Sequence, residues 1–341
     1  MKTREAWVDI IKGIGILAIV GSHAAMPAYF SLFDFAVNIM VPLFFFSAGY
    51  TYKKMGFKEM ILKRIKRLLV PFVICNMIIV TIDHFIGFCY DWGFGKTALL
   101  SQYKTILTGR IPNGLCAPSW FLICIFIVYL IFWGIHMLLE KHPYIVTVIC
   151  LACAVFVIAD FGFSTSVDWG GCKIILNVGL GLFVFAMGWL CKEKNLIAKI
   201  SADSPFCGGL FVAAVLGIKV IASVFEYSFD FRGGNANNPF FSLPVIITGL
   251  YAFVYLSVLI SKVQPFSAIL QRLGRNSLSI MLWHILCFQI VSALEIQFLG
   301  MTMDSWPNIY TGDIISPLLL TLVGTAIPIL GIRLREAVLG K

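Results

Sequence analysis

Three residues near the N-terminus carry side chains that can hold charge or move protons, and their spacing places them on one helix face. Asp9, Lys12 and His23 lie in W-V-D-I-I-K-G-I-G-I-L-A-I-V-G-S-H. At about 100° per residue, Lys12 and His23 point within about 20° of each other, and Asp9 and His23 within about 40°. The helical rise separates Lys12 from His23 by roughly 16 Å. These residues therefore mark two depths of one polar path, and the imidazole of His23 is a candidate general base.

The same residues also admit a structural explanation. Asp9 and Lys12 are three positions apart, so they can pair as ions near the start of the segment. His23 can form a hydrogen bond inside a helix bundle, and Gly13 and Gly15 permit a neighbouring helix to approach closely. The sequence leaves both explanations open.

A second candidate group lies in the basic segment K-R-I-K-R, where Arg64 and Arg67 are three positions apart. Two guanidinium groups suit a phosphate clamp, because each presents a planar fork of N–H donors. Such a clamp would hold a phosphorylated donor, and Lys12 would favour negative charge deeper along the path. Alternatively, the seven cations of 53–67 only set membrane orientation and contact anionic lipid headgroups.

Further polar residues are candidates for the substrate side of such a site. His284 places a second imidazole about two turns into another apolar run, where a core hydrogen bond is the expected role. Asn38, Ser47 and Asn276 carry groups that can stabilise negative charge on a reacting oxygen, and the sequence does not choose among them. No grouping of His, Cys, Asp or Glu in the sequence predicts a metal site.

The composition shows what kind of element must hold these residues. The chain has 341 residues, of which 60% are hydrophobic and 13% charged, and its mean hydropathy is +0.92. Average soluble domains are about 45–50% apolar and about 25% charged, so the composition excludes a soluble globular protein and also a disordered one. Lipid must surround most of the chain. The net charge of +9 is therefore attributed to membrane topology, and no nucleic-acid partner is expected.

The apolar runs predict a bundle of transmembrane helices. A helix needs about 20 mostly apolar residues to cross the hydrocarbon layer, and the continuity of the runs favours helices over barrel strands. The predicted spans are 7–26, 33–52, 68–87, 118–139, 144–162, 173–191, 206–225, 242–260, 277–298 and 314–333. We therefore expect an all-α, polytopic membrane helix bundle that forms a single domain over 1–341.

Lysine and arginine are distributed unevenly between the two sets of connections. Nineteen fall on the side of the N-terminus and five on the opposite side. This bias predicts that both termini lie in the cytoplasm. The longest connections, 88–117, 226–241 and 299–313, would then lie outside and could rim a cavity that opens to the outer face.

The ten cysteines favour packing over redox or metal chemistry. Most lie in apolar runs, and Cys150 and Cys153 form a C-x-x-C there without polar neighbours. Cys89, Cys116 and Cys172 fall in predicted outer connections, so a disulfide among these three stays open.

Five segments occur in an order that is typical of one family. The first is D-I-I-K-G-I-G-I-L-A-I-V-G-S-H, in which a basic residue stands eleven positions before a His, and the others are V-P-L-F-F-F-S-A-G-Y, R-I-K-R, P-S-W-F-L and L-G-R-N-S-L-S-I-M-L-W-H. Together they resemble the acyltransferase 3 family of integral membrane acyltransferases, especially its sugar O-acetylase-like members. The likeness runs from the first predicted span into the ninth, and it adds Trp120 of P-S-W-F-L to the substrate-side candidates.

The resemblance implies transfer of an acyl group from a cytoplasmic acyl-CoA, usually acetyl-CoA, to a hydroxyl of a cell-surface glycan or lipid-linked sugar. It implies that His23 is the essential histidine, with Asp9 and Lys12 on the same helix, and that Arg64 and Arg67 lie on the acyl-CoA side. Many members carry Arg where this chain has Lys12, which keeps the charge but loses the bidentate fork. The expected partners are acyl-CoA, the sugar acceptor and the lipids of a bacterial plasma membrane.

Two other classes of function compete with an enzyme. Polar residues in glycine-containing helices also describe the substrate path of a transporter or flippase. A structural scaffold would leave His23 dispensable. The combination of His23 with R-x-x-R favours the enzyme, while the acceptor, the acyl length, the face that receives the product, a possible acyl-enzyme and the oligomeric state stay open.

Overall fold

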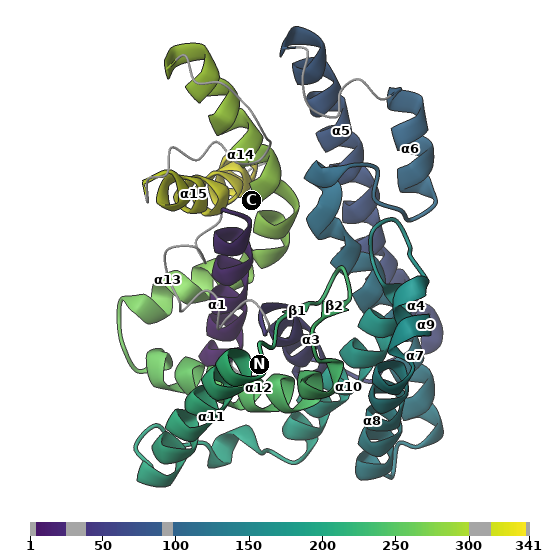
Figure 1. The fold of residues 1–341 in the computed structure, drawn as a ribbon, viewed down its shortest axis with the longest axis vertical. Coiled ribbons are helices and arrows are strands. Elements are labelled where there is room, and N and C mark those ends of the chain that lie inside the picture. The colour runs from purple at the N-terminus through teal and green to yellow at the C-terminus, as the bar shows by residue number, and fades with distance from the viewer. Residues whose placement is uncertain (1–4, 25–38, 91–97, 300–314, 339–341) are drawn as a thin grey trace.

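The protein is built almost entirely of helices (Figure 1). The computed structural model describes residues 5–24, 39–90, 98–299 and 315–338. The apolar runs form helices because a helix satisfies its backbone N–H and C=O groups internally, as lipid requires. Within the described ranges, the strands β1 (Phe229–Asp230) and β2 (Asn235–Ala236) pair as a short antiparallel hairpin. The all-α membrane bundle expected from the sequence is confirmed.

The helices follow one another along the chain. The first half contains α1 (Ala6–His23), α3 (Met40–Tyr50), α4 (Phe57–Arg64), α5 (Val70–Tyr90), α6 (Leu99–Leu107), α7 (Trp120–Leu138) and α8 (Pro143–Ala159). The second half contains α9 (Phe161–Ser166), α10 (Ile174–Glu193), α11 (Pro205–Val224), α12 (Ser242–Ser261), α13 (Phe266–Arg275), α14 (Ser277–Leu299) and α15 (Ile315–Val338). A π-helical turn, Ile65–Leu69, joins α4 to α5, and a 3₁₀ turn, Gly114–Ser119, leads into α7.

Seven helices in the described ranges are long and apolar enough to cross a membrane. They coincide with the predicted spans that begin at residues 7, 68, 118, 173, 206, 242 and 314. Shorter apolar helices, namely α3, α8 and the 277–292 part of α14, coincide with the other three predicted spans. The chain is therefore a polytopic helical membrane protein. The predicted membrane orientation stays a prediction.

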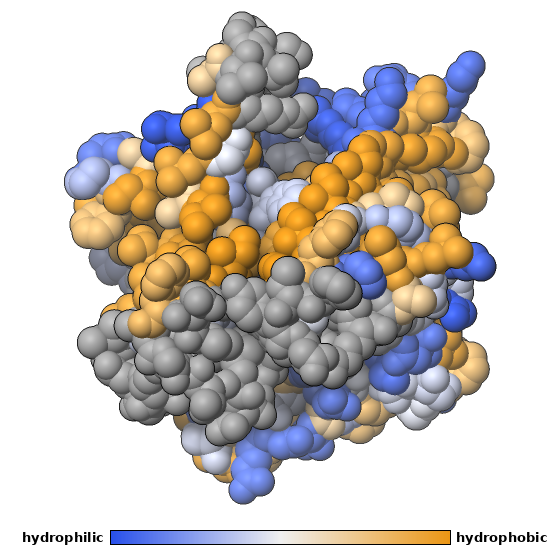
Figure 2. Space-filling model, turned by 90° about the horizontal axis from the view of Figure 1, so that it is seen from above, coloured by the Kyte–Doolittle hydropathy of each residue, from blue (hydrophilic) through white to orange (hydrophobic). Residues whose placement is uncertain are grey.

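Large hydrophobic side chains cover broad areas of the molecular surface (Figure 2). Phe206 is 79% exposed, and Phe156 and Leu216 are also exposed. Such surfaces suit hydrocarbon and not water. In contrast, 67% of the α1 segment and 67% of the α10 segment are buried inside the protein, against 11% of the α11 segment. Helices α1 and α10 are therefore inner helices, and α11 lies at the periphery.

Glycines allow the backbones of α1 and α13 to contact each other directly where the two helices cross. A Cβ atom on Gly274 of α13 would lie 1.8 Å from the carbonyl oxygen of Asp9, and one on Gly13 would lie 2.1 Å from the carbonyl oxygen of Leu270. No side chain fits at either position, as is common where membrane helices pack tightly. This crossing fixes the first half of the helix that carries His23.

A network around Glu5 fixes the start of α1. Its carboxylate accepts hydrogen bonds from Tyr50 Oη at 2.6 Å and Trp7 Nε1 at 2.9 Å, and it pairs with Lys192. Burial alone would raise the pKa of Glu5, but the hydrogen bonds from Lys192, Tyr50 and Trp7 outweigh it and lower the pKa below its ordinary value. Glu5 therefore ties α1 to α3 and α10 as a carboxylate.

Two apolar clusters meet along α1. One contains Trp7, Ile11 and Ala18 of α1 together with buried residues of α3, α7, α8, α10 and α12. The other contains Ile16, Val20 and buried residues of α5 and α14. The cluster residues nearest His23, Val20 and Ala24, belong to the second cluster, so the His23 end of α1 packs with α5 and α14.

Candidate active site

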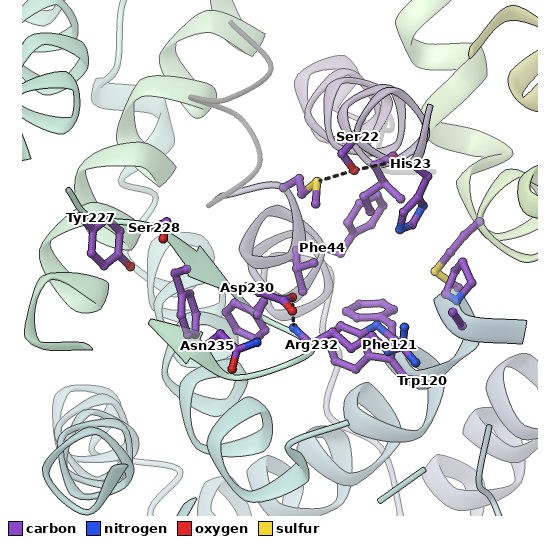
Figure 3. A pocket seen from close by; sticks show the side chains of 18 of the residues that line it. Ser22, His23, Phe44, Trp120, Phe121, Tyr227, Ser228, Asp230, Arg232 and Asn235 are labelled. Atoms are coloured by element: carbon purple, nitrogen blue, oxygen red, sulfur yellow. Dashed lines mark hydrogen bonds between the residues drawn. The ribbon is translucent and has the colours of Figure 1, made fainter. Parts of the chain in front are cut away.

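A cavity of about 790 Å³ lies at the His23 end of α1 (Figure 3). Its walls come from α1, α3, the start of α7, the end of α11, the β1–β2 hairpin and α14. The lining combines an imidazole, two cationic side chains and a carboxylate with aromatic rings. The residues used below are Ser22, His23, Phe44, Trp120, Phe121, Lys219, Asp230, Phe231, Arg232 and Asn235.

His23 forms a hydrogen bond with a second histidine from the far end of the sequence. Its Nδ1 atom lies 2.8 Å from Nε2 of His284, and the two rings are nearly parallel. His284 is fully buried, and its Nδ1 atom lies 2.9 Å from the carbonyl oxygen of Ile280. Helices α1 and α14 thus bring together two imidazoles that the sequence analysis treated separately.

The hydrogen-bond chain determines the tautomers of the neutral pair. A carbonyl oxygen only accepts, so Nδ1 of His284 must donate to Ile280, and Nε2 of His284 then has a lone pair. That lone pair accepts the Nδ1–H of His23, which leaves Nε2 of His23 unprotonated. Because His23 lines the cavity, this arrangement supplies a hydrogen-bond acceptor suited to removing a proton.

The β1–β2 hairpin places two charged side chains at the cavity opposite α1. The carboxylate of Asp230 accepts the backbone N–H of Arg232 at 3.0 Å, and the carbonyl of Arg232 accepts the backbone N–H of Lys173 at 3.1 Å. Gly234 closes the turn with a φ of +63°, a conformation that favours glycine. The hairpin is thereby fixed to the start of α10, and Asp230 and Arg232 face the same space as His23 (Figure 3).

The guanidinium group of Arg232 has unused hydrogen-bonding capacity. Its Nε atom is buried and has no hydrogen-bond partner among the described residues. A buried donor without a partner is costly unless a ligand or water completes it. Arg232 is therefore available to contact a bound molecule.

Aromatic rings form a further wall of the cavity. Trp120 and Phe231 are stacked, with ring centroids 6.5 Å apart and an interplanar angle of 22°. Phe121 lies edge-on to Phe44, with centroids 5.9 Å apart. Of the substrate-side candidates, Trp120 lines the cavity directly, and His284 contacts it through His23.

Two other substrate-side candidates lie away from this cavity, and one lies outside the described residues. Ser47 is buried and donates to the carbonyl of Phe44 at 3.1 Å. Asn276 donates to the carbonyl of Arg272 at 2.8 Å at the end of α13. Asn38 falls among the residues that the structure does not describe.

Asp9 and Lys12 form an ion pair of 3.0 Å near the α13 crossing. The pair matches the i, i+3 geometry expected from the sequence, and neither residue lines the cavity. Lys12 precedes His23 by eleven residues of α1, which corresponds to about 16 Å of helical rise.

Arg64 and Arg67 have different surroundings. The guanidinium carbon of Arg64 lies 3.6 Å from the centre of the Tyr129 ring, and the Nε atom of Arg64 is buried without a partner among the described residues. Arg67 is exposed. The π-helical turn that begins at Ile65 alters the angle between the two side chains, so one faces the bundle and the other faces outward. Neither arginine lines the cavity that contains His23.

The sequence analysis did not single out Lys219, Asp230 and Arg232 as site residues. Lys219 carried a usable signal, because an ionisable residue within an apolar span is a functional candidate. Asp230 and Arg232 belong to the connection 226–241, for which a role at the rim of a cavity was predicted, and this connection does line the cavity.

The described part of the chain contains no cluster of three His, Cys, Asp or Glu residues that could hold a metal ion. Cys116 and Cys172 are free thiols, and the side chain of Cys89 lies outside the described atoms. The Sγ atom of Cys172 lies 3.6 Å from that of Cys124 on α7.

The fold and this cavity define a membrane-embedded protein in which one histidine of a hydrogen-bonded pair lines a partly charged binding cavity. The chain belongs to the acyltransferase 3 family: the family model described as an acyltransferase domain matches residues 5–333. The resemblance found in the sequence is thereby confirmed, and membership implies acyltransferase activity with an acyl donor and an acceptor. No curated protein and no solved structure matches the chain.

Proposed function

We propose that the protein is an O-acyltransferase that moves an acyl group, acetyl in the simplest case, from cytoplasmic acyl-CoA to a hydroxyl of a cell-surface glycan or lipid-linked sugar. The observation that carries this proposal is the hydrogen-bond chain from His23 through His284 to the carbonyl of Ile280, which leaves Nε2 of His23 as an acceptor at a cavity of about 790 Å³. A hydroxyl is a poor nucleophile, and a positioned base accelerates its attack by typically 10²–10⁴-fold.

The reaction can be written with His23 as the proton carrier. Nε2 of His23 removes the proton of the acceptor hydroxyl as its oxygen attacks the carbonyl carbon of the thioester. The carbon–sulfur bond then breaks, and the departing thiolate of CoA takes the proton from His23. His284 holds His23 in the required tautomer throughout, because its Nδ1–H stays bonded to the carbonyl of Ile280.

Arg232 is suited to the negative charge that develops on the thioester oxygen. Its guanidinium lies at the same cavity as His23 and carries a buried Nε atom without a partner among the described residues. A positioned cation in a water-poor site stabilises such charge more than water does. The same cation would also attract a phosphate of a lipid-linked acceptor, so its kinetic test must separate kcat from KM.

The aromatic wall supports a sugar as acceptor. Trp120, Phe121 and Phe231 present apolar faces, while Asp230 and Asn235 provide polar groups at the same cavity. A sugar has apolar C–H faces together with hydroxyl groups, so this mixed lining fits it better than a purely apolar molecule.

The donor is proposed to enter from the side of Lys12 and Arg64. Tyr129, on which Arg64 lies, is nine residues after Trp120 on α7, which corresponds to about 14 Å of helix. Lys12 is a similar distance from His23 along α1. Cations at one depth could hold the nucleotide phosphates while the thin acyl-bearing arm extends toward His23.

The test compares the wild-type chain with His23→Gln and a matched control, His136→Gln. His136 is another buried histidine, and it lies 3.3 Å from the hydroxyl of Tyr52, outside the cavity. In detergent, release of CoA from acetyl-CoA, with the acetyl group passing to water or to an added sugar hydroxyl, should be lost in His23→Gln and retained in His136→Gln. Mass spectrometry of surface glycans from cells that make each form should show the same difference in acetylation.

Detergent removes the two compartments that transport requires, so CoA release there also separates an enzyme from a transporter. Normal acyl transfer by a correctly inserted His23→Gln protein would refute the proposed role of His23.

A further inference from the structure

A second cavity, of about 390 Å³, is lined by three arginines. Arg272 and Arg275 come from α13, Arg333 comes from α15, and Asn276 lies at the junction of α13 and α14. The cavity does not share any lining residue with the one that contains His23.

The residues that line this cavity carry a net positive charge, because three arginines face one carboxylate. Glu336 is the single carboxylate in its lining, and no ion pair joins it to any of the three arginines within the described chain. Arg275 instead donates through Nε to the carbonyl of Gln271 at 3.2 Å. Arg275 and Arg333 are exposed and Arg272 is half-buried, so an anion that enters between the three like charges is attracted from a side open to solvent.

The N-terminal end of α14, which lies beside the cavity, also favours binding of an anion. Helix α14 begins at Ser277, immediately after Asn276, and the N-terminal end of a helix carries a partial positive charge. The carbonyls at the end of α13, which would repel an anion, are already occupied. Those of Arg272 and Leu273 accept the backbone N–H of Asn276, and that of Arg272 also accepts the side-chain amide.

We propose that this arginine cavity binds a phosphate group of a ligand at the cytoplasmic face. A guanidinium group matches phosphate with two parallel N–H donors, and guanidinium groups from two helices can approach the phosphate oxygens from different sides. Positive-inside distribution of the basic residues assigns this end of α13 and α15 to the cytoplasm.

Two sources of such a phosphate are compatible with the position. One is the nucleotide part of CoA, because α14 leads from Asn276 to His284 over eight residues, or about 12 Å of helix. The other is the headgroup of an anionic lipid in the inner leaflet. The phosphate site itself does not depend on the proposed acyl transfer, and only the CoA arm rests on it.

The experiment measures binding to the full-length chain in nanodiscs of zwitterionic lipid. One arm titrates 3′,5′-ADP, the phosphorylated nucleotide of CoA, and the other measures retention of phosphatidylglycerol by native mass spectrometry. The variants are Arg272→Gln/Arg275→Gln/Arg333→Gln and a matched control, Arg110→Gln, whose guanidinium lies 5.0 Å from the Trp169 ring, away from this cavity.

The wild type should bind at least one of the two probes, with an affinity that falls as salt is added. The triple variant should bind that probe at least about tenfold more weakly, because several charge-assisted hydrogen bonds are lost. Arg110→Gln should bind it within about twofold of the wild type. The probe that responds identifies the source of the phosphate.

If the triple variant does not elute as a folded protein, the single exposed substitution Arg275→Glu replaces it and should weaken the same binding severalfold. The proposal is overturned if the wild type binds neither probe, or if the variants bind both as tightly as the wild type. Failure of acyl transfer in the His23 test would leave the lipid arm of this result unaffected.

Discussion

The Nδ1 atom of His23 and the Nε2 atom of His284 lie 2.8 Å apart although 261 positions separate the two residues in the chain. This contact makes the state of one ring depend on the other. Both ring nitrogens of His284 form hydrogen bonds, one with His23 and one with the carbonyl oxygen of Ile280. His284 therefore does more than fill space in the core.

Replacement of His284 should therefore reduce turnover without removing the base. In His284→Leu, the Nδ1–H of His23 loses its acceptor, and kcat should fall by about 10- to 100-fold, since a hydrogen bond to a reacting group contributes about 1.5–3 kcal/mol. His284→Gln offers an amide oxygen as acceptor and should retain more activity. Steady-state kinetics with acetyl-CoA checks this order, and equal losses in both variants would contradict it.

The position of Arg232 predicts an effect on the chemical step. Arg232→Gln removes a cation from the cavity, and kcat should fall by about 100-fold with little change in KM for acyl-CoA if the guanidinium stabilises the developing oxyanion. Arg110→Gln changes an arginine that does not line this cavity and serves as the control. An increase in KM for the acceptor alone would assign Arg232 to acceptor binding and contradict the catalytic role.

The elements of the fold were largely predictable because lipid imposes a simple rule: long apolar runs must be helices. The His23 motif could be found for a related reason, since a titratable residue inside such a run is costly. The pairing with His284 could not be found, because it depends on how α1 and α14 pack. Arg232 was missed because an arginine in a connection between spans looks like any exposed cation until the hairpin places it at the cavity.

The periodicity of K-R-I-K-R predicts that Arg64 and Arg67 are adjacent on a helix surface, and ordinary α-helical geometry supports that. The burial of the two side chains differs, however. The π-helical turn over Ile65–Leu69 changes the angle between successive residues, and nothing in the local sequence announces such a turn. Arg64 therefore packs on Tyr129 while Arg67 remains exposed.

Arg64 should affect donor binding more than turnover. Arg64→Ala removes a buried guanidinium and should raise KM for acetyl-CoA by about tenfold, because a charge-assisted contact to phosphate is lost. Lys66→Ala, an exposed cation of the same segment, provides the control and should change KM by less than about twofold. A KM unchanged in Arg64→Ala would show that the arginine acts only in packing against Tyr129.

The crossing of α1 and α13 should tolerate no side chain. Gly274→Ala would place a methyl group 1.8 Å from the carbonyl oxygen of Asp9, so the helices must separate, at a cost of about 1–3 kcal/mol or more. The melting temperature in detergent should fall, and activity should fall with it because α1 carries His23. Gly217→Ala is the control, since no atom lies within 4 Å of the added Cβ. Equal melting temperatures for the two variants would refute the close crossing.

The network around Glu5 predicts a dependence of stability on pH. Its folded-state pKa is lower than the ordinary value of 4.5, because the hydrogen bonds from Lys192, Tyr50 and Trp7 outweigh the effect of burial. A carboxyl group with a lowered pKa in the folded protein stabilises it fully above its unfolded-state pKa, and this contribution is lost as pH falls through the folded-state value. Glu5→Gln should therefore melt at a lower temperature than the wild type at neutral pH.

The difference in melting temperature between Glu5→Gln and the wild type should shrink as pH falls below 4.5, because the wild-type carboxylate becomes protonated and loses its pairing with Lys192. Glu193→Gln serves as the control, since Glu193 is exposed and forms no ion pair within the described chain, and its melting curve should follow the wild type. A difference for Glu5→Gln that stays constant from neutral to acidic pH would show that the lost contacts do not depend on the charge of Glu5.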